Sequence, residues 1–274
     1  MTAQTAAPEA DASAPPAAPG KLPSRKDVSA RIRDGGLVAA PFLIAALAGF
    51  LYLYYQSLDL ENAKRQQRSA LAWSENLVPQ IQDTLTIAFF STVIVIALAV
   101  PLGIMLTRES FRRIAPGIVG FANAGQAIPA YGLIVLALII GGQGKVSVVF
   151  ALALYALLPV LRNTMVGLDA VDRSVIEAGR GMGMTRRLVL ARIELPLAVP
   201  IIVAGIRTAV IINIGMSTLA YLIGGGGLGI TISSGIKLSQ NPVLIVGAVL
   251  VAIIALTFDW LGAVAERFLR PHGL

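Results

Sequence analysis

The sequence predicts an all-α, polytopic membrane protein with about six transmembrane helices. Hydrophobic residues make up 56% of the 274-residue chain and charged residues only 14%, whereas soluble domains carry about 25% charged residues. A mean hydropathy of +0.76 exceeds what one soluble core could hide. The apolar residues also gather in segments of about 20 residues, the length at which a helix crosses a bilayer.

The apolar segments divide the chain. The predicted spans lie near 35–55, 84–107, 116–140, 146 to 161–168, 197–223 and 243–265. They leave an N-terminal tail over 1–34, a first span over 35–55 and a five-helix core over 84–270 that includes a long connection, 169–196. The first twenty residues are rich in Ala and Pro and are expected to be disordered, because they bury little apolar surface. Prolines that can kink the spans occur at 41, 101, 129, 159 and 200.

Lysine and arginine are divided unequally between the two ends of the predicted spans. Sixteen belong to the tail, the second-to-third and fourth-to-fifth connections and the C-terminal segment, and five belong to the opposite connections. Because cytoplasmic loops carry the excess of Lys and Arg, both termini of this membrane protein are predicted to be cytoplasmic. Topology therefore accounts for the net charge of +7, and no nucleic-acid partner is expected.

The chain offers no residue set for catalysis or metal binding. It has no cysteine, and its only histidine is His272, so thiolate chemistry and a His-based triad are excluded. In "GGQGKVS", Val146 occupies the position where a phosphate-binding loop needs Ser or Thr. We therefore expect a chain that is not an enzyme and that binds no cofactor.

The connection before the fifth span is charged and punctuated by glycine, with "EAGRGMGMTRRLVLARIELP" over 177–196. A first short helix is expected to end at Gly181 and Gly183, and Thr185 is expected to cap a second. One face of this second helix is expected to carry Leu188, Ala191, Ile193 and Leu195. Two amphipathic helices joined by a glycine turn are typical of a docking element. A loop lying among lipid headgroups is the alternative.

Seven positions in this stretch align with the pattern EAA-x3-G-x9-I-x-L-P, and all but one carry the residue that it specifies. They are Glu177, Ala178, Gly179, Gly183, Ile193, Leu195 and Pro196. The stretch resembles the coupling loop of ABC importer permeases of the type I fold. Gly179 stands where the pattern has Ala, and this departure is expected to cost the first helix about 1 kcal/mol of propensity.

The resemblance implies the partners of a binding-protein-dependent importer. The loop would dock on a separate cytoplasmic ATPase subunit, so that ATP is bound and hydrolysed there and not on this chain. A second permease subunit, identical or related, would complete the membrane part. An extracytoplasmic binding protein would deliver the substrate.

Three further segments concern the substrate. "ALLPVLRNT", "GIRTA" and "STLAYLIGGGGLG" together resemble permeases for glycine betaine, choline, carnitine and similar osmoprotectants. Methionine is the alternative cargo, because methionine permeases share a similar glycine run. The run from Gly224 to Gly229 formally matches a dinucleotide-binding pattern, but it follows a membrane span and not a strand, so a flexible outer turn is expected. A rival of another class is an ion channel or secondary transporter without an ATPase.

Charged and polar side chains within the spans are candidates for function. Arg207 and Asp259 are candidates for a structural or gating ion pair, because charged groups in a membrane find partners; direct contact with the substrate is the alternative. Candidates for lining a path are Asn123, Gln126, Tyr131, Asn213, Ser217 and Thr218; the alternative for these residues is interhelical hydrogen bonding. Tyr131, Tyr155 and Tyr221 are candidates for a cation cage.

Overall fold

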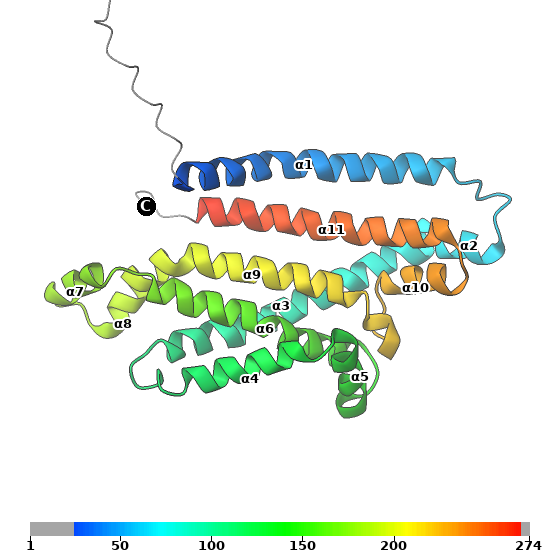
Figure 1. The fold of residues 1–274 in the computed structure, drawn as a ribbon. Helices are drawn as coiled ribbons and strands as arrows, with labels where there is room; N and C mark the ends of the chain where they lie inside the picture. The colour runs from blue at the N-terminus through cyan, green and yellow to red at the C-terminus, as the bar shows by residue number, and fades with distance from the viewer. Residues whose placement is uncertain (1–24, 270–274) are drawn as a thin grey trace, which may run out of the picture. The chain divides into compact units, whose positions relative to one another are not determined.

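The computed structural model describes residues 25–269 and divides the chain into two units, 1–36 and 37–274. The second unit carries the site, and the part of the chain that the structure describes is helical, without strands (Figure 1). The helices are α1 Arg25–Ser57, α2 Arg65–Ala70, α3 Val78–Leu106, α4 Ala115–Ala127, α5 Ala130–Gly141, α6 Lys145–Asp169, α7 Arg173–Gly181, α8 Arg186–Val189, α9 Leu195–Ser217, α10 Gly229–Lys237 and α11 Asn241–Phe268. The predicted disorder of the first twenty residues lies outside the described residues, as does His272.

Within residues 25–269, five helical stretches are long and apolar enough to cross a membrane, which confirms five of the six predicted spans. They are Leu37–Ser57, Trp73–Leu106, Lys145–Asp169, Arg186–Ser217 and Asn241–Phe268. The prediction placed the end of the fifth span too late. Its helix ends at Ser217, because a 3₁₀ turn over Ala220–Ile223 leads into a left-handed Gly224.

The predicted third span, 116–140, is not one straight helix. α4 and α5 are bent by 99° at the break between them. Ile128 has an extended ψ of 126°, and Pro129 caps α5 with ψ 136°. The proline ring disfavours helical geometry at the residue before it, so the helix stops at Ala127. The structure has six spans only if this bent pair counts as one.

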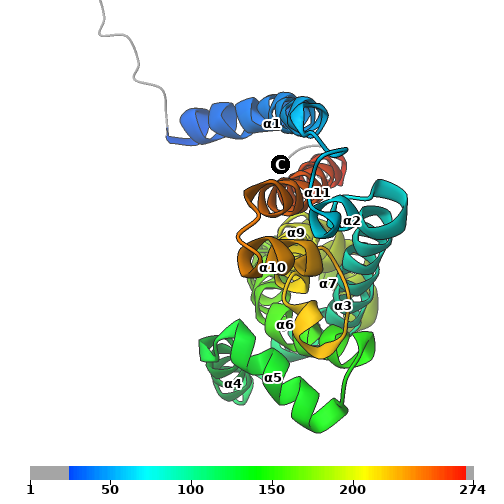
Figure 2. The same cartoon turned by 90° about the vertical axis from the view of Figure 1, so that its right-hand side faces the viewer.

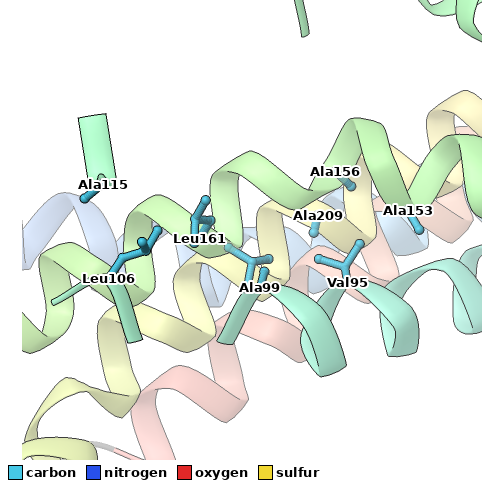
Figure 3. Close-up of a cluster of buried hydrophobic side chains, with 9 residues drawn as sticks. Val95, Ala99, Leu106, Ala115, Ala153, Ala156, Leu161 and Ala209 are labelled. Atoms are coloured by element: carbon cyan, nitrogen blue, oxygen red, sulfur yellow. The ribbon is translucent and has the colours of Figure 1, made fainter. Parts of the chain in front are cut away.

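The core is built from α3, α6 and α9, which pack on one another along their lengths. Small residues fill the shared interior, among them Ala99, Ala156 and Ala209, and these are labelled in Figure 3. Glycines bring the helices closer still, since a Cβ at Gly103 would lie 2.7 Å from the Cβ of Thr164. Such small residues are typical of membrane interfaces, where close backbone approach gains van der Waals contact.

The remaining helices surround this core. In the view of Figure 2, α11 lies on one side of α3, α6 and α9, and the bent α4–α5 pair lies on the other. The part of α1 from Leu37 onward buries few residues, as expected of a lipid-facing helix. It is joined to the core by Leu51 and by the Tyr55 hydroxyl, which donates to the Leu71 carbonyl at 2.8 Å.

Two π-helical turns, Trp73–Leu77 and Leu190–Glu194, precede α3 and α9. Each is followed two residues later by a proline, Pro79 or Pro196. A proline ring clashes with the carbonyl four residues before it, and in both cases that carbonyl belongs to the wider π turn. Helix therefore continues from Arg186 through Ser217. The second short helix predicted for the connection is the first part of the fifth span and not a separate element.

Candidate coupling site and intramembrane polar residues

The α7–α8 connection is a short helical hairpin with a capping residue before each helix. Before α7, the Asp172 carboxylate accepts from the backbone N–H of Ser174 at 2.9 Å. This backbone hydrogen bond, helped by the Ser174 side chain, lowers the pKa of Asp172 below its ordinary value. Before α8, the Thr185 hydroxyl accepts from the Leu188 N–H at 3.4 Å, which confirms the predicted cap.

Gly183 ends α7 in a Schellman motif. The Met184 N–H donates to the Gly179 carbonyl at 3.2 Å, and the Gly183 N–H donates to the Arg180 carbonyl at 2.9 Å. Gly183 has φ +84°, the left-handed conformation that this motif requires and that glycine adopts without strain. The position is exposed, and no atom lies within 4 Å of an added Cβ. The left-handed backbone thus explains why the pattern has glycine at this position. The absence of a side chain also leaves the tip of the hairpin uncovered.

Gly179 packs against Ile193, another position of the pattern. Gly179 is buried, and a Cβ there would lie 2.5 Å from Ile193 Cδ1. The side chain of Ile193 therefore occupies the space that an alanine methyl would fill. The expected loss of helix propensity at Gly179 is offset by this contact between the two arms of the hairpin.

The other pattern residues are more open. Glu177, Ala178 and Pro196 are exposed, and Leu195 is half-buried. The predicted apolar face of the second helix is wrong in part: Leu188 and Ala191 are exposed, whereas Val189 is fully buried. The π turn at Leu190–Glu194 shifts the helical phase, so the 3.6-residue period used for the prediction does not hold there.

An ion pair that the sequence did not reveal joins the hairpin to the turn that follows α3. Arg108 donates from Nη2 to Glu194 Oε2 at 2.6 Å and from Nη1 to Oε1 at 3.3 Å. Glu194 is only 5% exposed. A two-pronged guanidinium–carboxylate contact is among the strongest polar links. The only sequence signals were a charge at a span end and a charge beside Pro196, and neither identifies its partner.

Arg207 and Asp259 come together across α9 and α11. Arg207 donates from Nε to Asp259 Oδ1 at 2.5 Å and from Nη2 to Oδ2 at 2.7 Å. Glu266, about two turns further along α11, lies 3.9 Å from the same guanidinium. Gly262 lies against the side chain of Arg207, with a Cβ there 2.9 Å from Arg207 Cγ. This glycine makes room for the arginine between the two spans.

The candidate path-lining residues occupy three different settings. Asn213 is buried and donates to the Thr92 hydroxyl at 3.0 Å, while its own Oδ1 has no partner among residues 25–269. Ser217 and Thr218 donate to carbonyls of their own helix. These contacts match the alternative of bonding within and between helices. Tyr131 is 57% exposed on α5.

Asn123 and Gln126 form a pair of contacts between α4 and α6. Asn123 accepts from Arg162 at 2.8 Å, and Gln126 donates to the main-chain oxygen of Tyr155 at 3.1 Å. Arg162, which the sequence assigned to the cytoplasmic side, lies within α6. Both candidates thus bond to α6, whereas Asn213 bonds to Thr92 of α3.

The three tyrosines considered for a cation cage belong to α5, α6 and the 3₁₀ turn. Among the described residues, no ring contact joins any two of them. The Tyr221 ring instead lies 5.6 Å from Lys237 Nζ. These contacts give no support to a cage built by this chain alone.

The glycine run before α10 is packed and not a flexible turn as predicted. Gly225, Gly227 and Gly229 are buried. The Leu228 N–H donates to Thr84 Oγ1 at 3.0 Å, which ties the run to α3. Left-handed φ values at Gly224, Gly226 and Gly227 allow the tight path, because residues with a Cβ rarely adopt them.

The fold and the hairpin together define a multi-pass membrane component with a built surface between its fourth and fifth spans. Residues 99–271 match the model of the family described as "Binding-protein-dependent transport system inner membrane component". The match covers more than half of the chain, and the chain belongs to this family. The resemblance predicted from the coupling-loop pattern is thereby confirmed at the level of the family.

Two similar proteins come from Bacillus subtilis (strain 168). The choline transport system permease protein OpuBB is 42% identical over 198 residues, covering 72% of this chain and 90% of that protein. The glycine betaine/carnitine/choline transport system permease protein OpuCB is 44% identical over 192 residues, which cover 70% of this chain and 88% of that protein.

A further relative and a solved structure extend the comparison. The osmoprotectant import permease protein OsmY of Salmonella typhimurium is 37% identical over 222 residues, covering 81% of this chain and 91% of that protein. The fold is also similar to a chain of the inward-facing MetNI methionine ABC transporter, with TM-score 0.63 and 23% identity over 71% of this chain and 96% of that one. This confirms the predicted permease fold.

Proposed function

We propose that this chain is the permease subunit of an ATP-driven importer for small quaternary-ammonium osmoprotectants such as glycine betaine, carnitine and choline. The support is the family membership together with relatives whose names carry these substrates, at 37–44% identity over most of both chains. Methionine has weaker support, because the methionine transporter chain is similar in fold at 23% identity.

The observation that carries the coupling part of the proposal is the α7–α8 hairpin. Its tip is exposed, and it presents the apolar side chains of Val175, Met182 and Leu188 to the outside. Its base is fixed by the buried Glu194 and its link to Arg108. A surface of this kind suits a rigid docking knob for an ATPase subunit, which would bind and hydrolyse ATP. This chain would bind no cofactor itself.

The proposal includes two further partners. An extracytoplasmic binding protein would meet the α10 end, where α2, α3 and α10 form a pocket whose lining mixes polar residues such as Arg65 and Ser234 with apolar ones such as Ile230. A second permease subunit would complete the path. A channel or secondary transporter would need neither the ATPase nor the binding protein, so dependence on both separates the two classes.

The proposed orientation places both termini and the α7–α8 hairpin in the cytoplasm. The loop charge asymmetry supports it. Because the chain has no cysteine, single cysteines report the topology cleanly. Ser239 and Ser174 are both exposed. The cysteine of Ser239→Cys should react with an impermeant thiol reagent added outside, and the cysteine of Ser174→Cys should not. The reverse labelling would overturn the orientation and the coupling proposal with it.

Reconstitution tests the function directly. Proteoliposomes with this chain, its ATPase subunit and its binding protein should accumulate radiolabelled glycine betaine when supplied with ATP. Omission of ATP or of the binding protein should abolish the accumulation. Uptake that persists without ATP would place the protein in the channel or secondary-transporter class.

A further inference from the structure

The face formed by α4 and α6 carries a cation, Arg162, within the helical stretch Lys145–Asp169, which is long and apolar enough to span a membrane. Arg162 lies seven residues before the last residue of α6, which is roughly 10 Å along the helix axis. The residue is exposed in this chain. A charged side chain is costly in lipid and faces a water-filled path or a partner. The exposed face around Arg162 is therefore not an ordinary lipid-facing surface.

The guanidinium of Arg162 is held against α4. Its Nη2 donates to Asn123 Oδ1 at 2.8 Å, and Asn123 lies eight residues after the first residue of α4, about 12 Å along that helix. Gln126, one turn further along α4, makes the second bond to α6. A long arginine side chain near a span end can extend its guanidinium to the membrane surface, away from the side chains at its own depth. Here the contact with Asn123 keeps the charge at its own depth.

Arg162 retains a full positive charge available to an anion. Asn123 is neutral, and it is the only acceptor that the guanidinium contacts among the described residues. The ion pairs of that part of the chain use Arg108, Lys145 and Arg207 instead. A guanidinium has five N–H donors, so one bond to Asn123 leaves an edge free for a second ligand.

We propose that Arg162 binds the carboxylate of zwitterionic osmoprotectants while they pass through the permease, and that Asn123 positions the guanidinium. This proposal rests on the proposed function. Glycine betaine and carnitine carry a carboxylate, which accepts two parallel hydrogen bonds from a guanidinium. Choline carries only the quaternary ammonium and a hydroxyl, and Arg162 repels its charge. The residue thus favours zwitterions over a simple cation within the permease, in addition to any selection by the binding protein.

Two variants remove the free guanidinium by different routes. Arg162→Gln removes the charge, whereas Asn123→Asp supplies an internal carboxylate at hydrogen-bond distance from Arg162 and occupies its donors without changing side-chain size. The measurement is the initial uptake of radiolabelled glycine betaine and of choline by the complete reconstituted transporter, with the same saturating binding protein throughout. Both variants should lower glycine betaine uptake about 10-fold or more, as expected when charge-assisted bonds are lost, and neither should lower choline uptake.

A matched control removes one cation elsewhere. Arg112→Gln lies in the exposed connection between α3 and α4 and should leave both uptake rates unchanged, while Arg162→Lys should retain part of the glycine betaine rate. The proposal is overturned if Asn123→Asp transports glycine betaine at the unmodified rate, or if an assembled variant loses both substrates equally. A wild-type complex that imports neither substrate would instead refute the proposed function.

Discussion

Two glycine-punctuated connections lie at opposite ends of the helical bundle and differ in the space around their glycines (Figure 1). At the α7–α8 end, Gly183 is exposed, and an added Cβ would meet no atom within 4 Å. At the α10 end, Gly229 is buried, and a Cβ there would overlap the main-chain carbonyl of Thr218. One connection leaves its surface free, and the other is part of the packed interior.

The comparison teaches that glycine content alone does not predict flexibility. A glycine can allow a left-handed backbone in an open turn, or it can allow two backbones to approach closely in a buried one. The first use keeps a surface available to a partner. The second holds helices at a fixed distance, as the bond from Leu228 to Thr84 also does.

The largest effect is expected at the packed end. Gly229→Ala would place a methyl group against a backbone carbonyl that cannot rotate away, so overpacking should cost about 3 kcal/mol or more. Thermal unfolding in detergent measures the loss. Gly215→Ala is the control, since no atom lies within 4 Å of its added Cβ. Equal melting temperatures for the two variants would show that the surroundings of Gly229 are not tightly packed, and the contrast between the two ends would then be wrong.

A smaller loss of stability is expected from the ion pair between Arg207 and Asp259, which joins α9 to α11. Removing one partner leaves a charge that is about 30% exposed, so each single alanine variant should cost about 1–3 kcal/mol, less than a fully buried pair. The double variant should cost less than the sum, because it removes Arg207 and Asp259 together and leaves neither of these two charges without the other. Coupling within about 0.5 kcal/mol of zero in a double-mutant cycle on unfolding would refute the pair.

At the α7–α8 end, the size of the side chain at position 183 should affect docking of the ATPase more than it affects the stability of the fold. Gly183→Leu should reduce ATPase co-purification and uptake strongly, because the side chain would project from the exposed tip of the hairpin. The strain of a non-glycine residue at φ +84° adds only about 1–2 kcal/mol. Gly183→Ala carries the same strain with little bulk and should retain most of the coupling. Unchanged co-purification and uptake for Gly183→Leu would rule out docking at this position.

The smallest effect concerns the cap of α7. The pKa of Asp172 is lowered in the folded chain by the bond from Ser174, so the ionised carboxylate stabilises the helix. This contribution is present above the ordinary carboxyl pKa and is lost as the pH falls through the lowered one. Hydrogen exchange of the α7 amides should therefore be faster in Asp172→Ala than in the unmodified chain at neutral pH, and the difference should vanish in acid. A difference that persists in acid would show that the carboxylate charge is not the cause.

The sequence by itself determined the features that depend on local chemistry. Apolar runs of about 20 residues predict spans, and the structure confirms five of the six as helices. A hydroxyl before a helix predicts a cap, and Thr185 makes that contact. Arg207 and Asp259 were also predictable, because charges within apolar spans need partners and few were present.

Only the tertiary structure decided which faces meet. The burial of Gly179 depends on where Ile193 lies after the hairpin closes, and the link from Arg108 to Glu194 joins residues 86 positions apart. The packing of the glycine run depends on the neighbouring Thr218 and Thr84. Helix and turn signals act over a few residues, whereas these contacts are set by the register and crossing of whole helices, which no local pattern encodes.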